Sequence, residues 1–119
     1  DYVHIVAMEK ITIGNNVLMA SHIFISDNSH GSYKGDENDS SPTIPPTNRD
    51  YPTSSIYIGD NSWICDGVMI MPGSTIGKGC IIGAHSIVRG EIPDFSIAAG
   101  NPAKVIKKYN FEKKRWEKI

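Results

Sequence analysis

The sequence predicts an all-β solenoid, a triangular prism whose faces are built from short parallel strands. Three observations support this prediction: the choice of aliphatic residues, a repeat of six residues, and the small or polar residues that punctuate the repeat. The chain has 119 residues, of which 39% are hydrophobic. That length suits one globular domain and leaves no room for two.

The aliphatic side chains argue against helices. The chain contains 18 Ile and 6 Val but a single Leu, Leu18. β-Branched side chains lose rotamer freedom in a helix, whereas they pack well on a pleated strand. Eleven Gly and seven Pro add frequent turns. The composition therefore indicates a β-rich protein with many corners.

An aliphatic residue recurs at every sixth position of the second half of the chain. The repeat comprises Ile58, Ile64, Ile70, Ile76, Ile82 and Val88, and Ile13, Met19 and Ile25 keep the same phase upstream. A period of six is neither helical nor that of a plain alternating strand. Three short strands joined by tight corners make a coil of about 18 residues, with the repeat side chain stacked inside the prism. The alternative, an ordinary β-sandwich, would place turns every 8–12 residues or so.

The repeat is lost in two places. Between Ser29 and Ile56 it gives way to a polar, proline-rich stretch, so we expect a β-helix domain of residues 1–103 with an extruded loop at residues 31–55. Residues 104–119 form a basic C-terminal tail with seven Lys or Arg and two Glu. Its aromatic residues predict a short amphipathic helix, with Tyr109, Phe111 and Trp116 on the apolar side.

The sequence lacks the patterns typical of membrane-spanning, disulfide-rich and metal-binding proteins. No stretch approaches the roughly 18 apolar residues of a membrane span, so we expect no transmembrane segment. Cys65 and Cys80 are too few for a disulfide framework, and lone thiols suit a reducing cytoplasm. His4, His22 and His85 lack ligand-like spacing, so we expect no metal site.

Several segments resemble a known family. They are ITIGNNVLMAS (11–21), SDNSHG (26–31), IGDNSWI (58–64) and AAGNPAKVIKK (98–108). The chain resembles the hexapeptide-repeat, left-handed β-helix acyltransferases, and is similar to galactoside and maltose O-acetyltransferases and to polysaccharide-modifying O-acetyltransferases. The resemblance implies left-handed coiling and transfer of an acetyl group from acetyl-CoA to a sugar hydroxyl. It also implies a homotrimer with active sites between subunits, acting on a saccharide or another small-molecule acceptor.

The resemblance implies that His30, in the segment DNSHG, is the catalytic base. The chemistry fits, because an alcohol must lose its proton as it attacks the thioester carbonyl, and imidazole exchanges protons near neutral pH. Asp27 or a backbone carbonyl would hold the ring in the required tautomer, and the sequence does not choose between them. Without the family motif, a histidine at this position reads as an ordinary surface residue of a loop.

The resemblance also implies a coenzyme A site. Trp63 would lie beside the acetyl donor or the acceptor, or would pack in the trimer, because a large aromatic at an outward position needs a cover. Ala84 and Arg89 would follow the pantetheine groove. Lys104 and Lys107 would face the phosphates, which agrees with the net charge of +5 on residues 104–119 against −6 on residues 1–103.

Two other functions stay open. N-acylation of an amino sugar or a small amine would use the same scaffold. A more distant alternative is a non-catalytic protein whose basic tail binds nucleic acid or an anionic membrane. The segment GNPAK (100–104) just ahead of the tail argues against that alternative, and we expect no nucleic-acid partner.

Overall fold

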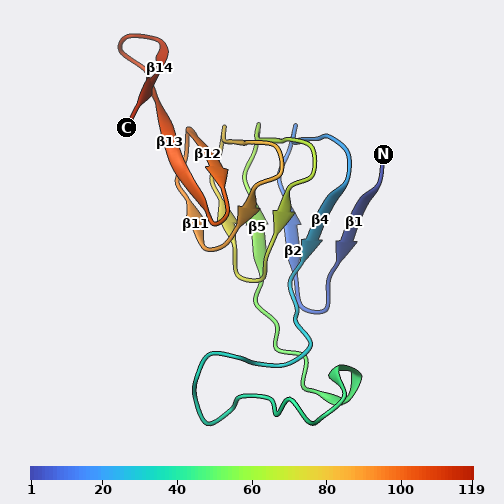
Figure 1. Ribbon diagram of the computed structural model, residues 1–119. Coiled ribbons are helices and arrows are strands. Elements are labelled where there is room, and N and C mark those ends of the chain that lie inside the picture. Colours follow the sequence, from blue (N-terminus) through green and yellow to red (C-terminus); the bar gives the residue numbers. More distant parts are fainter.

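The computed structural model describes residues 1–119 as a triangular prism of stacked β coils (Figure 1). Its strands form three faces, which we name A, B and C. Face A holds β1 (Val3–Val6), β4 (Ile23–Ser26), β7 (Met69–Ile70) and β10 (Ile87–Val88). Face B holds β2 (Ile11–Ile13), β5 (Ile56–Ile58), β8 (Thr75–Ile76) and β11 (Glu91–Ile92).

Face C is the largest. It holds β3 (Leu18–Met19), β6 (Trp63–Ile64), β9 (Ile81–Ile82) and β12 (Ser96–Gly100), and it continues into β13 (Ala103–Asn110) and β14 (Arg115–Lys118). From β1 to β12 the chain visits faces A, B and C in turn, and neighbouring strands within a face are parallel. The all-β class and the parallel coils predicted from the repeat are confirmed.

The repeat residues form the core. Ile58 pairs in register with Ile76, and Ile64 pairs with Ile82, so each lies directly above its counterpart in the next coil. All six members of the downstream repeat are 0% exposed. Burying one such side chain contributes about 1.5–3 kcal/mol of hydrophobic stabilisation. The stack of β-branched side chains is therefore what holds the coils together.

The corners require small residues because the backbones of successive coils approach closely there. A Cβ on Gly59 would lie 2.7 Å from the carbonyl carbon of Gly77 and 2.7 Å from the amide nitrogen of Lys78. Ser62 fills the corner with a hydroxyl that donates to the Gly77 carbonyl at 2.9 Å and accepts from the Cys80 amide at 3.2 Å. Buried polar groups inside the corner are thus paired, as low-dielectric surroundings demand.

The long loop leaves the prism at the corner between faces A and B, at the lower side of Figure 1. Its only regular element is a 3₁₀ turn, η1 (Pro46–Asn48). The two legs are joined at the base, where the Gly31 amide donates to the Asp50 carbonyl at 2.7 Å and the Ser29 amide donates to the Pro52 carbonyl at 3.2 Å. The two legs are therefore held together at the base of the loop.

The helix predicted at the C-terminus is wrong. Residues 103–118 form an antiparallel hairpin of β13 and β14, and β13 also pairs antiparallel with β12. Tyr109 faces Trp116 across the hairpin, with ring centroids 5.3 Å apart, and Phe111 packs edge-on against both Tyr109 and Phe95. The segment forms a strand and not a helix because β12 would otherwise have an unpaired edge. As a strand, β13 pairs with that edge and also lets the aromatic side chains pack together.

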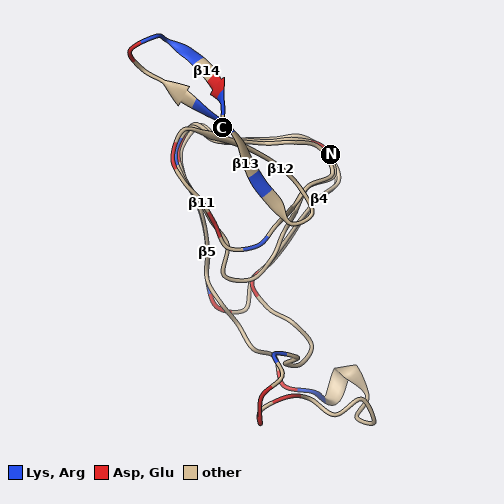
Figure 2. Ribbon diagram, turned by 60° about the vertical axis from the view of Figure 1, so that its left-hand side comes forward, with Lys and Arg blue, Asp and Glu red and all other residues tan.

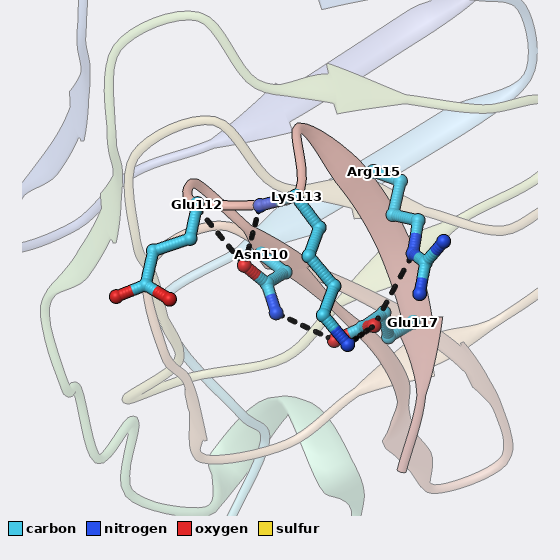
Figure 3. Close-up of polar contacts among 5 residues, drawn as sticks. All are labelled: Asn110, Glu112, Lys113, Arg115 and Glu117. Carbon is cyan, nitrogen blue, oxygen red and sulfur yellow. Dashed lines mark hydrogen bonds and ion pairs between the residues drawn. The ribbon is translucent and has the colours of Figure 1, made fainter.

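Polar contacts close the tip of the hairpin (Figure 3). The Asn110 side-chain carbonyl accepts from the amides of Glu112 and Lys113, each at 3.0 Å. The Asn110 side-chain amide donates to Glu117 at 2.8 Å, and Arg115 pairs with the same carboxylate at 3.3 Å. The hairpin and the long loop extend away from the prism in different directions (Figures 1 and 2). The structure contains no helix that is long and apolar enough to cross a membrane.

Candidate active site

His30 lies at the start of the long loop, at the corner between faces A and B, and its side chain is exposed. The ring packs edge-on against Tyr51 from the returning leg, with centroids 4.7 Å apart and planes inclined at 72°. The Tyr33 hydroxyl donates to the His30 backbone carbonyl. Neither ring nitrogen makes a hydrogen bond within the chain, so both are available to a ligand.

Asp27 serves a different part of the corner. Its side chain is 0% exposed and accepts the amides of Met8, Glu9 and Lys10 at 2.8–2.9 Å, together with the Asn28 side-chain amide at 3.1 Å. Burial opposes ionisation, but these donors outweigh it and lower the pKa of Asp27 to about 2. Asp27 makes no hydrogen bond to His30, so the structure does not bring the two predicted residues together.

The turn that Asp27 holds also carries a residue that the sequence did not single out. The Glu9 carboxylate accepts hydrogen bonds from the hydroxyls of Thr53, at 2.6 Å, and Ser55. These bonds lower the pKa of Glu9, with Ser55 as the larger cause and Thr53 next. Glu9 therefore ties the returning leg of the loop, which bears Tyr51, to the turn between β1 and β2.

Face C gathers most of the residues predicted for coenzyme A. On its outer side Trp63 pairs in register with Leu18 and Ile81, Ile81 pairs with Ile97, and Ile97 pairs with Lys107. Trp63 is 45% exposed within the single chain. Lys104 stands opposite Ala99 on the adjoining strand. The structure thus brings Trp63, Lys104 and Lys107 onto one surface.

A row of small residues lines the end of the strands of face C. Each follows an inward residue of the stack: Ala20, Cys65, Gly83 and Ala99. A Cβ on Gly83 would lie 3.1 Å from the Ala99 Cβ, so a larger residue would crowd its neighbour. The row leads to Lys104, which pairs with Ala99. An extended ligand could lie along it with its anionic end at the lysine.

Ala84 and Arg89 do not lie together. Ala84 is exposed in the turn between faces C and A, next to the small-residue row. Arg89 follows β10 and lies at the corner between faces A and B, which is also the corner of His30. Strand β10 separates the two residues. Within a single chain, the two residues that the resemblance assigned to one groove lie at two corners of the prism.

The predicted site residues therefore fall into two groups on opposite sides of the prism. His30 and Arg89 occupy the corner between faces A and B, and that corner is opposite face C, which carries Trp63, Lys104 and Lys107. Figure 2 shows the triangular outline, with the loop at one corner and the hairpin at the far side. A single chain does not bring the two groups into contact.

Neither thiol is set up as a nucleophile. Burial raises the pKa of Cys65, and Asp66 adds to the effect; burial also raises the pKa of Cys80. The Cys80 thiol is fully buried. No group of His, Cys, Asp or Glu is placed to hold a metal ion.

Comparison with known proteins finds similar acetyltransferases. Residues 55–90 match the family described as bacterial transferase hexapeptide (six repeats). Over 118 residues the chain is 50% identical to a protein named as a lipopolysaccharide biosynthesis O-acetyl transferase, WbbJ, of Escherichia coli (strain K12). The chain thus contains a segment that matches this family and is similar to WbbJ over nearly its whole length. The match to WbbJ covers 99% of this chain and 60% of that protein.

Solved structures of acetyltransferases share this fold. A galactoside acetyltransferase in complex with coenzyme A superposes with a TM-score of 0.78 at 37% identity, over 95% of this chain and 52% of that one. A maltose O-acetyltransferase from Clostridium difficile 630 superposes with a TM-score of 0.65 at 26% identity, over 92% of this chain and 67% of that one. The prism is a left-handed parallel β-helix, as the resemblance implied.

Proposed function

We propose that this chain carries the catalytic core of an acetyl-CoA-dependent O-acetyltransferase, with His30 as the general base and a sugar hydroxyl as the acceptor. One observation carries the proposal: His30 is exposed at the anchored base of the loop, and both of its ring nitrogens are free of partners within the chain. The similarity to a galactoside acetyltransferase and to WbbJ supports the reaction class.

The chemistry is a direct transfer within a ternary complex. His30 takes the proton of the acceptor hydroxyl while that oxygen attacks the thioester carbonyl. The tetrahedral intermediate collapses, the carbon–sulfur bond breaks, and the departing thiolate recovers the proton from the imidazolium. Backbone N–H groups would stabilise the oxyanion. Direct attack is favoured over an acyl-enzyme because both thiols have raised pKa values and neither has a partner base.

Face C is the proposed site of acetyl-CoA. The pantetheine arm would lie along the small residues Cys65, Gly83 and Ala99, and Lys104 and Lys107 would meet the phosphates. Trp63 would cover the arm near its reactive end. The free thiols of the chain are compatible with the reducing cytoplasm, where we place the reaction.

We further propose a homotrimer in which each site combines the His30 corner of one copy with face C of the next. Two outer faces carry apolar rows: Phe24, Met69 and Ile87 on face A, and Leu18, Trp63, Ile81 and Ile97 on face C. Two different surfaces that both need covering form head-to-tail contacts, which close into a ring. Face A borders the His30 corner, so this contact would join the two groups. A monomer in light scattering at micromolar concentration contradicts the proposal.

The decisive experiment measures release of CoA from acetyl-CoA across a panel of sugars and amino sugars. His30→Ala is expected to lower kcat by about 100-fold or more, because general-base catalysis is lost. His22→Asn is the matched control, since His22 is exposed at a different corner and stacks only on Tyr2. If kcat of His30→Ala stays within about threefold of the parent value, the assignment of His30 as the base is wrong. Faster reaction with amino sugars than with their hydroxyl counterparts would replace O-acylation by N-acylation.

A further inference from the structure

A pocket of about 410 Å³ opens between the two legs of the long loop. Ser29, Ser32, Tyr33 and Lys34 of the outgoing leg form one wall, and Ser54 of the returning leg forms the other. Pro72, from the next coil, closes the end. The volume lies at the lower end of the range for small-molecule sites. Only one of the nine lining residues is hydrophobic, although carbon atoms make up most of the lining surface.

The polar groups of this pocket are not used by the fold. The hydroxyls of Ser29, Ser32 and Ser54 make no hydrogen bond within the chain, and the Lys34 ammonium has no ion pair. Thr53, which also lines the pocket, is the exception, because its hydroxyl donates to Glu9. Three free hydroxyls and an ammonium offer both donors and acceptors. They match a ligand that itself carries many hydroxyls.

The aromatic wall of the pocket is held in place before any ligand binds. The Tyr33 hydroxyl donates to the His30 carbonyl and accepts from the Arg49 guanidinium at 2.7 Å. Arg49 in turn donates from Nε to the Ile44 carbonyl at 2.8 Å. Gly31 has a φ of +103°, and a Cβ there would lie 2.7 Å from the Ser40 hydroxyl and would also run into the Tyr33 hydroxyl. These contacts therefore hold the Tyr33 side chain in one position on the outgoing leg.

The pocket lies beside the reacting centre and not on it. Ser29 and Gly31, the neighbours of His30 in the chain, both line the pocket, whereas His30 does not. A ligand in the pocket would sit next to the hydroxyl that His30 deprotonates. We propose that the pocket is a saccharide subsite for the sugar unit adjacent to the acetylated one, so that the acceptor is a disaccharide or longer. This inference rests on the proposed function.

Other ligand chemistries fit less well. An apolar ligand would leave the hydroxyls unsatisfied, and only one lining residue is hydrophobic. An anionic ligand would meet Lys34 as the sole cation of the lining, while the same loop carries Asp36, Glu37 and Asp39. A neutral polyhydroxylated ring is the ligand that these groups recognise best.

The test compares acceptors of increasing length: glucose, maltose and maltotriose, and separately galactose and lactose. The subsite predicts that kcat/KM rises by about tenfold from monosaccharide to disaccharide, as expected for two additional hydrogen bonds. The double variant Ser32→Ala, Ser54→Ala is expected to bring that ratio close to one. Ser41→Ala is the matched control, because Ser41 lies on the same loop outside the pocket and contacts Thr43; it should keep the ratio of the parent chain.

Binding of maltotriose and lactose by isothermal titration supplies a readout without catalysis. Equal kcat/KM values for the monosaccharides and disaccharides overturn the subsite and leave the proposed function standing. Saccharide binding that the double variant weakens, without any release of CoA, supports the subsite and overturns the proposed function. If no CoA is released and the double variant does not weaken saccharide binding, both the subsite and the proposed function are overturned.

Discussion

Asp27→Asn tests how the corner below His30 is held. Oδ1 of Asp27 accepts from Met8 and Asn28, and Oδ2 accepts from Glu9 and Lys10. Asparagine keeps one oxygen and replaces the other by an NH₂ group. Whichever way the amide is turned, two of the four donors then face another donor.

The expected cost follows from this count. A hydrogen bond to a charged group contributes about 1.5–3 kcal/mol, so the loss of two predicts a destabilisation of about 3–6 kcal/mol. That is a large part of the roughly 5–15 kcal/mol that stabilises a typical domain. Asp60→Asn is the matched control, because Asp60 accepts a single amide, that of Asn15 at 2.7 Å, which the asparagine oxygen can retain. Its cost should stay below about 1 kcal/mol.

Urea unfolding followed by circular dichroism measures both variants, with the free energy taken at a common slope. The pH dependence gives a second check. The folded pKa of Asp27 is about 2, below the reference value of 3.8. Its contribution is therefore complete above about pH 4 and is lost as the pH falls toward 2. The difference between parent and Asp27→Asn should shrink over that interval. A cost no larger than that of Asp60→Asn, or a difference independent of pH, refutes the reasoning.

Three further predictions concern the core and face C. Ile70→Ala removes a side chain that is 0% exposed and should destabilise the fold by about 2–5 kcal/mol in the same urea assay. Lys104→Glu with Lys107→Glu should raise the KM for acetyl-CoA several-fold while thermal unfolding stays near that of the parent; an unchanged KM argues against phosphate contacts. In a Trp116→Phe background, the fluorescence of Trp63 should respond to CoA, and no response to CoA or to acceptor counts against a ligand contact.

The core of the fold was predictable because one local rule determines it. A spacing of six with inward Ile58 and Ile64 fixes which side chains are buried, whatever the rest of the chain does. The C-terminal hairpin was not predictable in this way, because the spacing of Tyr109 and Trp116 fits either a helix or two strands. The choice depends on the open edge of β12, which lies outside that segment.

The site was predictable only in part. The motif led to the proposal of His30 as the base. The Glu9 contacts span 44 and 46 positions of the chain, and no local pattern marks them. The separation of His30 from Trp63 did have a signal. The faces follow one another every six residues, and the loop does not interrupt their order, so counting coils from β4 would have placed Trp63 on the face opposite His30.

That separation yields the sharpest test of the assembly. If each site takes His30 from one copy and Lys104 with Lys107 from the next, then two defective variants can repair each other. His30→Ala lacks the base, and Lys104→Glu with Lys107→Glu lacks the phosphate contacts. The two variants are expressed together in equal amounts and assayed at an acetyl-CoA concentration well below the raised KM. Each is also assayed alone.

In a ring with random composition, a site is intact when the base comes from one variant and the lysines from the other. Each condition is met half of the time, so about a quarter of the sites should work in the mixture. A site contained in one chain gives no such gain, because every chain would carry one defect. Activity near a quarter of the parent rate therefore supports a site shared between copies. Activity no greater than the mean of the two variants places the base and the lysines of one site in the same chain. Such a site would require the loop or the hairpin to cross the width of the prism.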